Sequence, residues 1–289
     1  MTWQWTIALI LYLVLAPALG ILLAGLDRKL SARMQRRMGP PVIQPYYDVR
    51  KLLAKEHQAV NRLQDMYVVC SLLFTVIAGA LLFAGNDLLL MVFTLTLADV
   101  FLVLAAYSSG SPFAQVGAER ELYQMMCYEP MLLLTMIGFY LVCGSFKSAD
   151  IISTTAMPFP LMLGIFAGFL FMLTLKLRKS PFDLSTSEHA HQDLVKGLTT
   201  EFSGQTLALT EIAHWYESIL LLGVVFLFFC NGTWWGFVLG IVAAVASYFL
   251  ETFIDNCFAR MKWQVALKSA WAVTAVLGLI NVAILLWGL

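Results

Sequence analysis

Charged residues are scarce in this sequence. Asp, Glu, Lys and Arg make up 12% of its 289 residues, whereas 60% are hydrophobic and the mean hydropathy is +0.80. A soluble domain carries roughly 25% charged residues, so the composition excludes a large soluble domain. We therefore predict one transmembrane domain over residues 1–289, embedded in the lipid bilayer and without a nucleic-acid partner.

Grouped cysteines and nucleotide-binding motifs are also missing. The five cysteines are scattered, none forms a CxxC pair, and four lie within apolar runs. An iron–sulfur cluster needs several neighbouring thiolates, so we expect none in this chain. Neither GxxxxGK[ST] nor GxGxxG occurs, so any nucleotide chemistry must belong to other chains. His189 and His191 have no third ligand at a suitable spacing, so we expect no metal site and interpret them as titrating loop residues.

Eight apolar runs are long enough to cross a membrane, which takes roughly 20 residues per helix. They cover residues 3–26, 66–84, 88–107, 122–146, 157–175, 206–230, 232–254 and 269–289. No basic segment precedes the first run, so we predict a retained span rather than a signal peptide. The predicted fold class is all-α, a polytopic membrane protein with about eight transmembrane helices.

Lys and Arg are distributed very unevenly among the connecting loops. Seventeen of the eighteen fall after the first, third, fifth and seventh runs, and only Lys147 falls in another loop. Because cytoplasmic loops carry the excess of basic residues, both termini should face outward and the long loops should face the cytoplasm. We predict a multi-pass protein of the cell (cytoplasmic) membrane.

The first of these loops, residues 27–65, contains a predicted amphipathic helix. Tyr46, Val49, Leu52 and Leu53 share one face of the helix, and charged residues occupy the other. Such a helix should lie at the cytoplasmic face of the membrane, with its basic residues at headgroup level. The pattern leaves open whether it docks a partner or only attaches the loop to anionic lipid.

Several ionisable residues fall inside the runs, where burial is unfavourable and each is a functional hypothesis. The third and fourth runs carry Asp99 and Glu129, and the sixth carries Glu211, His214 and Glu217 on one broad face. Carboxylates and imidazoles in such surroundings can pass protons. Interhelical hydrogen bonding is the alternative explanation for all of them.

Two more acids, Glu251 and Asp255, close the seventh run four residues apart. They lie close to the interface, where long polar side chains reach water or bind neighbouring helices. For this pair we favour the structural explanation over a role in proton transfer.

Two further loops, residues 108–121 and 176–205, are rich in acids. Ser180-Pro181-Phe182 should end the helix before the second loop, because proline has no N–H to donate. This loop holds five residues that could move protons: Asp183, Glu188, His189, His191 and Glu201. We therefore expect proton chemistry to concentrate there.

Three segments resemble one known family. RRMGPPVIQPYYDVRKLLAKE (36–56) resembles the first cytoplasmic loop of subunit 1 of respiratory complex I, the NADH:quinone oxidoreductase. SGSPFAQVGAERELYQMMCYEP (109–130) and KSPFDLSTSEHAHQDLVKGLTTEFSG (179–204) resemble two acid-rich segments of the same superfamily. GPP in place of GPN, SGSPF with ERE, and the late run DNCFARMKW resemble the membrane-anchor subunit of group 4, Ech-type, energy-converting [NiFe] hydrogenases.

This resemblance implies a non-catalytic subunit without a cofactor of its own. In such complexes a soluble arm takes electrons from ferredoxin through iron–sulfur clusters to a [NiFe] centre, where protons become H2. The expected partners are the hydrogenase large and small subunits, an iron–sulfur ferredoxin-like subunit and an antiporter-like membrane subunit. The chain would anchor the arm and couple its reaction to proton or sodium translocation.

The resemblance also assigns expected roles to particular residues. Docking to the soluble arm is expected of Asp48, Lys51, Lys55 and Glu56. The expected proton relay consists of Asp99, Glu119, Glu121, Glu129, Asp183, Glu188, Glu201, Glu211, His214 and Glu217. Thr186 departs from the pattern, because complex I has another Glu there. Two alternatives stay open: a complex I subunit 1 that lines a quinone tunnel, and a purely structural membrane anchor.

Overall fold

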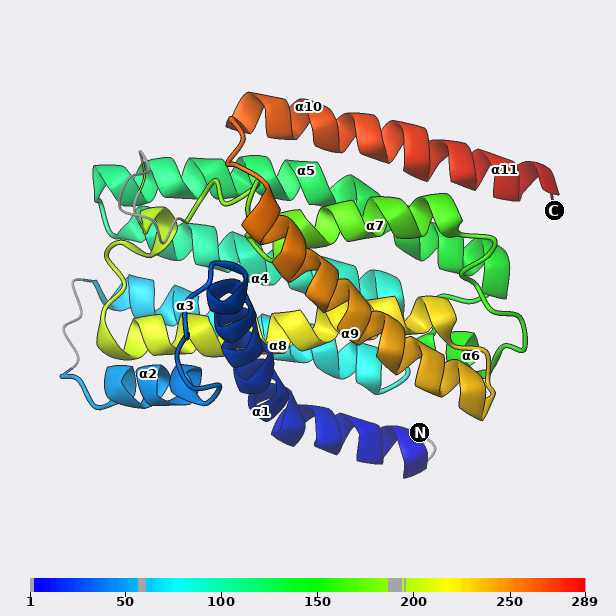
Figure 1. Cartoon of the computed structure of the whole chain (residues 1–289), viewed down its shortest axis with the longest axis horizontal. Helices are drawn as coiled ribbons and strands as arrows, with labels where there is room; N and C mark the ends of the chain where they lie inside the picture. Colours follow the sequence, from blue (N-terminus) through cyan, green and yellow to red (C-terminus); the bar gives the residue numbers. More distant parts are fainter. Residues whose placement is uncertain (1–2, 57–60, 187–193, 195, 289) are drawn as a thin grey trace.

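The computed structural model describes residues 3–56, 61–186, 194 and 196–288. These residues form an elongated bundle of helices (Figure 1) and contain no β-strand, which confirms the all-α fold class. The helices are α1 (Trp3–Met34), α2 (Gln44–Leu53), α3 (Arg62–Phe83), α4 (Leu88–Ser108), α5 (Pro112–Cys143), α6 (Ser148–Ser153), α7 (Leu163–Lys176), α8 (Gly204–Phe229), α9 (Trp234–Cys257), α10 (Trp263–Val273) and α11 (Ile280–Gly288). A 3₁₀ turn, η1 (Gly197–Thr199), precedes α8, and a π-helical turn, η2 (Thr274–Leu279), joins α10 to α11.

Seven helical stretches of the described chain are long and apolar enough to cross a membrane. They are α1, α3, α4, α5, α8, α9 and the continuous stretch Trp263–Trp287. The predicted fifth span, residues 157–175, instead gives the 14-residue helix α7. At 1.5 Å per residue α7 is about 21 Å long, shorter than the roughly 30 Å hydrocarbon core. The turn before α7 is held by protein, since the Phe159 N–H donates to the Phe228 carbonyl of α8 at 2.9 Å.

The first residues of α1 and the last of α11 lie at one end of the bundle (Figure 1). Helix α2 and the start of α8 lie at the opposite end, which we call the loop end. The termini and the long basic loops are therefore separated along the bundle, as the distribution of Lys and Arg predicts. That the loop end faces the cytoplasm stays a prediction.

Helix α5 begins earlier than the sequence suggests. It starts at Pro112 and continues through Pro130 to Cys143, so residues 112–121 are helical rather than part of the expected loop 108–121. Proline is favourable in the first helical turn, where its missing N–H would have had no partner and its φ is already helical. The acids of that segment are thereby held on a helix.

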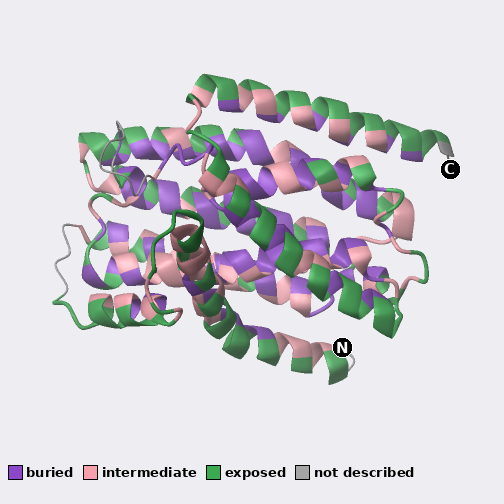
Figure 2. Ribbon diagram, in the orientation of Figure 1, coloured by how far each residue is buried: buried purple, intermediate pink, exposed green. Residues whose placement is uncertain are grey.

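The buried side chains concentrate in the middle of the bundle (Figure 2), where α4, α5, α7 and α8 pack together. Helix α1 and the stretch α10–α11 lie at the periphery and expose many apolar side chains, among them Leu15 and Trp271. Lipid stabilises such faces in a membrane protein. The polar groups that are buried in the central layer are therefore the unusual feature of this fold.

Candidate functional site

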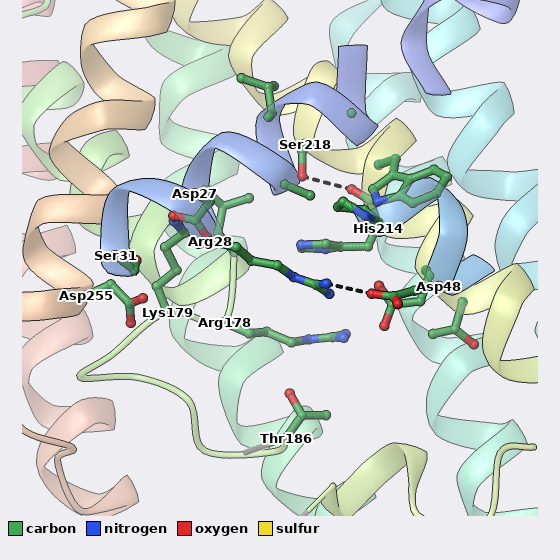
Figure 3. A pocket seen from close by; sticks show the side chains of 18 of the residues that line it. Asp27, Arg28, Ser31, Asp48, Arg178, Lys179, Thr186, His214, Ser218 and Asp255 are labelled. Carbon is green, nitrogen blue, oxygen red and sulfur yellow. Dashed lines mark hydrogen bonds and ion pairs between the residues drawn. The ribbon is translucent and has the colours of Figure 1, made fainter. Parts of the chain in front are cut away.

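A cavity of about 590 Å³ lies at the loop end, between α1, α2, α8, α9 and the segment after α7. Arg28, Asp48, Arg178, Lys179 and His214 gather around it (Figure 3). Acids and strong bases line it in equal number: Asp27, Asp48, Asp183, Glu211 and Asp255, with Arg28, Lys51, Arg178, Lys179 and Lys196. A lining of this kind suits water and ions rather than an apolar ligand.

Helix α2 forms one wall of the cavity. Val49 packs with Ala208 and Trp215 of α8, which fixes the apolar face of α2 on the bundle. Arg28 binds the Asp48 carboxylate at 2.7 Å, and the Gln44 amide donates to it at 3.1 Å. Partial burial acts to raise the pKa of Asp48, but the hydrogen bonds from Arg28 and Gln44 outweigh it, so the pKa lies below its usual value.

The other predicted docking residues lie at the C-terminal end of α2. Lys51 lines the cavity, and Lys55 and Glu56 are exposed. The last two border a second hollow of about 400 Å³, shared with Phe202 and Gly204. Their role in docking a soluble arm stays a prediction, whereas Asp48 faces the cavity (Figure 3).

Behind the cavity lies a group of ionisable residues that we call the buried cluster: Asp99 of α4, Tyr128 of α5, Lys176 of α7 and Glu217 of α8. The Lys176 ammonium forms ion pairs with Asp99 and with Glu217, the latter at 2.7 Å. The Tyr128 hydroxyl donates to the same Asp99 oxygen at 2.7 Å and accepts from Lys176 at 3.3 Å. The Lys176 side chain is only 3% exposed, so the contacts of this charge are made with the protein.

Two residues connect the buried cluster with the cavity. His214, which lines the cavity, lies one turn before Glu217 with its Nδ1 atom 3.6 Å from a Glu217 oxygen. Arg178, also in the lining, donates to Glu121 of α5 at 2.8 Å. Burial opposes the charge of Arg178, but Glu121 outweighs that effect and raises the pKa of Arg178 above its usual value. Arg178 therefore stays charged, while a histidine such as His214 is the side chain suited to change charge near neutral pH.

The segment after α7 is shaped to deliver two lysines to different places. Helix α7 ends at Lys176, and Arg178 adopts a left-handed conformation with φ of 53°, which turns the chain. The Gln124 amide of α5 then donates to the Phe182 carbonyl at 2.7 Å, and the Met261 N–H donates to the Pro181 carbonyl at 3.0 Å. These contacts hold the segment against α5 and the start of α10.

The structure brings together only part of the predicted relay. Asp99 and Glu217 belong to the buried cluster, and His214 adjoins it. Glu121 is buried beside Arg178. Asp183 and Glu211 line the cavity instead.

The remaining predicted relay residues lie apart from the buried cluster. Glu129 is half-buried on α5 and makes no ion pair within the described residues, although the charge of Lys176 acts on it. Glu119 is exposed on α5, and Glu201 is half-buried just before α8. Glu188, together with His189 and His191, lies outside the described residues.

Sequence reasoning missed three members of the site, Lys176, Tyr128 and Arg178. Counting Lys and Arg by loop placed both basic residues in solvent, but they are buried in ion pairs. A signal for Lys176 exists, because it directly follows an apolar run in a chain with several buried acids. Nothing in the pattern distinguishes Tyr128 from an ordinary core aromatic.

The bundle and its buried cluster define a polytopic membrane protein with ionisable groups connected to a cavity at one end. The sequence model of the family described as "NADH dehydrogenase" matches residues 6–286, and the chain belongs to this family. Hydrogenase-4 component C of Escherichia coli (strain K12) is 34% identical to it over 219 residues, which is 70% of this chain and 67% of that protein. A membrane subunit of the NADH-quinone oxidoreductase of Cereibacter sphaeroides (strain ATCC 17029 / ATH 2.4.9) is 32% identical over 97% of this chain and 95% of that one.

A similar fold occurs in the structure of the membrane-bound sulfane sulfur reductase, an archaeal respiratory membrane complex. The TM-score is 0.85, and the match covers 97% of this chain and 99% of that one. At 24% identity this likeness concerns the fold alone.

Proposed function

We propose that the chain anchors the soluble arm of a ferredoxin-linked, H2-evolving [NiFe] hydrogenase in the cytoplasmic membrane and couples its reaction to proton or sodium translocation. The 34% identity with hydrogenase-4 component C supports the hydrogenase assignment. The soluble arm would bind at the loop end, where Lys55 and Glu56 are exposed. An antiporter-like membrane subunit would bind an apolar side of the bundle.

The observation that carries the coupling role is the composition of the buried cluster. With all groups charged, Lys176 supplies one positive charge, and Asp99 and Glu217 supply two negative ones. The excess negative charge can attract one proton or respond to a change of charge at His214 in the cavity. A simple structural contact would be satisfied by one acid and one base, so the second buried acid favours a coupling role.

The redox cofactors of such a complex would lie in the partner subunits. Within the described residues no group of three or more His, Cys, Asp or Glu side chains could hold a metal ion. The described chain therefore offers binding surfaces and ionisable groups. Electrons would pass through the hydrogenase large and small subunits and the ferredoxin-like subunit.

A second candidate is the role of subunit 1 in complex I, favoured by the 32% identity with the NADH-quinone oxidoreductase relative over 97% of this chain. In that role the cavity would receive a quinone. The equal numbers of acids and strong bases in the lining speak for hydrated ions over a largely apolar ring.

The test is to purify this chain with its partners from membranes in mild detergent and to assay the same fraction. We expect nickel, iron and ferredoxin-dependent H2 evolution, and ion uptake when the fraction is reconstituted in vesicles. A fraction that contains flavin and quinone and oxidises NADH would instead establish the complex I role. H2 evolution without ion uptake would contradict coupling and leave a structural anchor.

A further inference from the structure

A second group of polar residues lies on the other side of the cavity, and we call it the α9 cluster: Asp27 of α1, Lys179 of the segment after α7, and Glu251, Thr252 and Asp255 of α9. The Lys179 ammonium binds Asp27 at 2.7 Å and donates to the Thr252 hydroxyl at 3.2 Å. The Ser180 N–H donates to Asp255 at 2.7 Å. Asp27, Lys179 and Asp255 gather at one wall of the cavity (Figure 3).

Glu251 is the exception within this cluster. The residue is 0% exposed, and neither carboxyl oxygen has a hydrogen-bond partner among the described residues. A buried, ionised carboxylate without hydrogen bonds is strongly unfavourable, and such a group is stabilised by taking up a proton. Burial and the missing partners therefore indicate that Glu251 carries a proton in this arrangement.

Titratable groups from three segments surround Glu251. The charges that act on it are those of Lys179 and Asp255, and Asp255 is influenced in turn by Asp27 and Asp183. On α9 itself, Tyr248 and Asp255 lie three residues before and four after Glu251, so all three share one face of the helix. Tyr248 and Asp255 line the cavity, so this face leads from Glu251 to the cavity.

Lys179 is placed where it can choose between acids. Its ammonium binds Asp27 and lies 4.9 Å from the centre of the Tyr248 ring. It forms no ion pair with Glu251 within the described residues. A small shift from Asp27 toward α9 would bring a positive charge to Glu251 and stabilise its ionised form.

We propose that Glu251 is a proton-binding site and that Lys179 controls it by exchanging Asp27 for Glu251. When Lys179 moves to Glu251, the O–H bond of Glu251 breaks, and the proton passes to the Asp255 carboxylate and on to the cavity. Lys179 keeps all its protons, and no electron is transferred. The use of this site in ion translocation rests on the proposed function, whereas proton binding by Glu251 does not.

The proton on Glu251 can be observed directly by infrared spectroscopy of the purified membrane complex. A protonated carboxyl group gives a carbonyl stretch that is separate from the ionised form and shifts in D2O. We expect the wild type to show one such component that Glu251→Gln lacks, while the exposed control Glu119→Gln keeps it. Thermal stability should stay unchanged in Glu251→Gln, because a neutral amide replaces a neutral acid. Identical spectra of the wild type and Glu251→Gln would overturn the proton-binding site.

Variants of the partners test the control by Lys179. Asp27→Asn frees Lys179, so we expect the Glu251 component to disappear although Glu251 is intact. Lys179→Gln should retain the component, and the double variant Asp27→Asn/Lys179→Gln should restore it. Persistence of the component in Asp27→Asn would overturn the exchange. Since the resting complex is measured without an electron donor, these results do not depend on whether the complex evolves H2 or moves ions.

Discussion

Lys176 and Lys179 lie three residues apart, yet they enter two different charge clusters. Lys176 is held between two carboxylates and a tyrosine hydroxyl. Lys179 binds one carboxylate and a threonine, and a buried acid beside it has no partner in the described part of the chain. The first cluster is saturated and the second is not, so the first should govern stability and the second should respond more readily to added charge.

The largest expected effect comes from removing the cation of the saturated cluster. Lys176→Met leaves Asp99 and Glu217 buried without their positive partner. Loss of one member of a buried ion pair destabilises a protein by about 3–5 kcal/mol. Thermal unfolding in detergent and the yield of assembled complex should both fall strongly.

The exposed Lys262 provides the matched control for that substitution. Lys262→Met should leave both quantities unchanged, and Lys176→Met/Glu217→Gln should recover part of the lost stability. If Lys176→Met were as stable as Lys262→Met, the description of a saturated cluster would be wrong.

A smaller effect is expected from Tyr128→Phe, which removes only the hydroxyl. Asp99 then loses one buried hydrogen bond, and bonds to charged groups contribute about 1.5–3 kcal/mol. Thr252→Val removes a hydroxyl from the unsaturated cluster and is the comparison variant. Unfolding midpoints should fall further for Tyr128→Phe, and the reverse order would contradict the contrast between the clusters.

Lys179→Met should destabilise less than Lys176→Met. Its partner Asp27 has a side chain that is 25% exposed and lines the cavity, so water can replace the lost cation. We expect a loss of about 1 kcal/mol, as for partly exposed ion pairs. Equal unfolding midpoints for the two lysine variants would remove the distinction.

The smallest effect concerns pH and the contact between α1 and α2. The pKa of Asp48 lies below its usual value because Arg28 and Gln44 stabilise its charged form, despite partial burial. Its stabilising contribution is therefore present at neutral pH and is lost as pH falls through the lowered pKa. The difference in unfolding midpoint between wild type and Asp48→Asn should shrink as pH falls. A difference that stays constant into the acidic range would contradict this sign.

Much of the fold could be predicted because hydropathy and charge placement act over long stretches. Lys and Arg counts separated the two ends of the bundle, and single acids in apolar runs identified Asp99 and Glu217. The same counts misplaced Lys176, since a loop rule assigns every basic residue to solvent and cannot recognise a partner from another helix. The short helix α7 was missed because hydropathy measures apolar content and not helical length.

The acids at the end of α9 show the same limit from the other side. Both Glu251 and Asp255 were predicted to be structural, and Asp255 does hold the Ser180 backbone. Glu251 lies one turn away on the same face but has both oxygens buried without a partner in the described structure. Spacing along a helix does not reveal which of two acids receives a hydrogen bond from a distant segment.

Ion uptake per H2 evolved, measured in vesicles that contain the purified complex, tests the proposed coupling role of the buried cluster most directly. Glu217→Gln keeps the shape of the side chain but removes its charge, and the exposed Glu119→Gln is the matched control. We expect Glu217→Gln to lower this ratio by about tenfold, equivalent to roughly 1.4 kcal/mol, while Glu119→Gln leaves it unchanged. A wild-type ratio in Glu217→Gln, with normal assembly and H2 evolution, would contradict the coupling role and leave the chain a structural anchor.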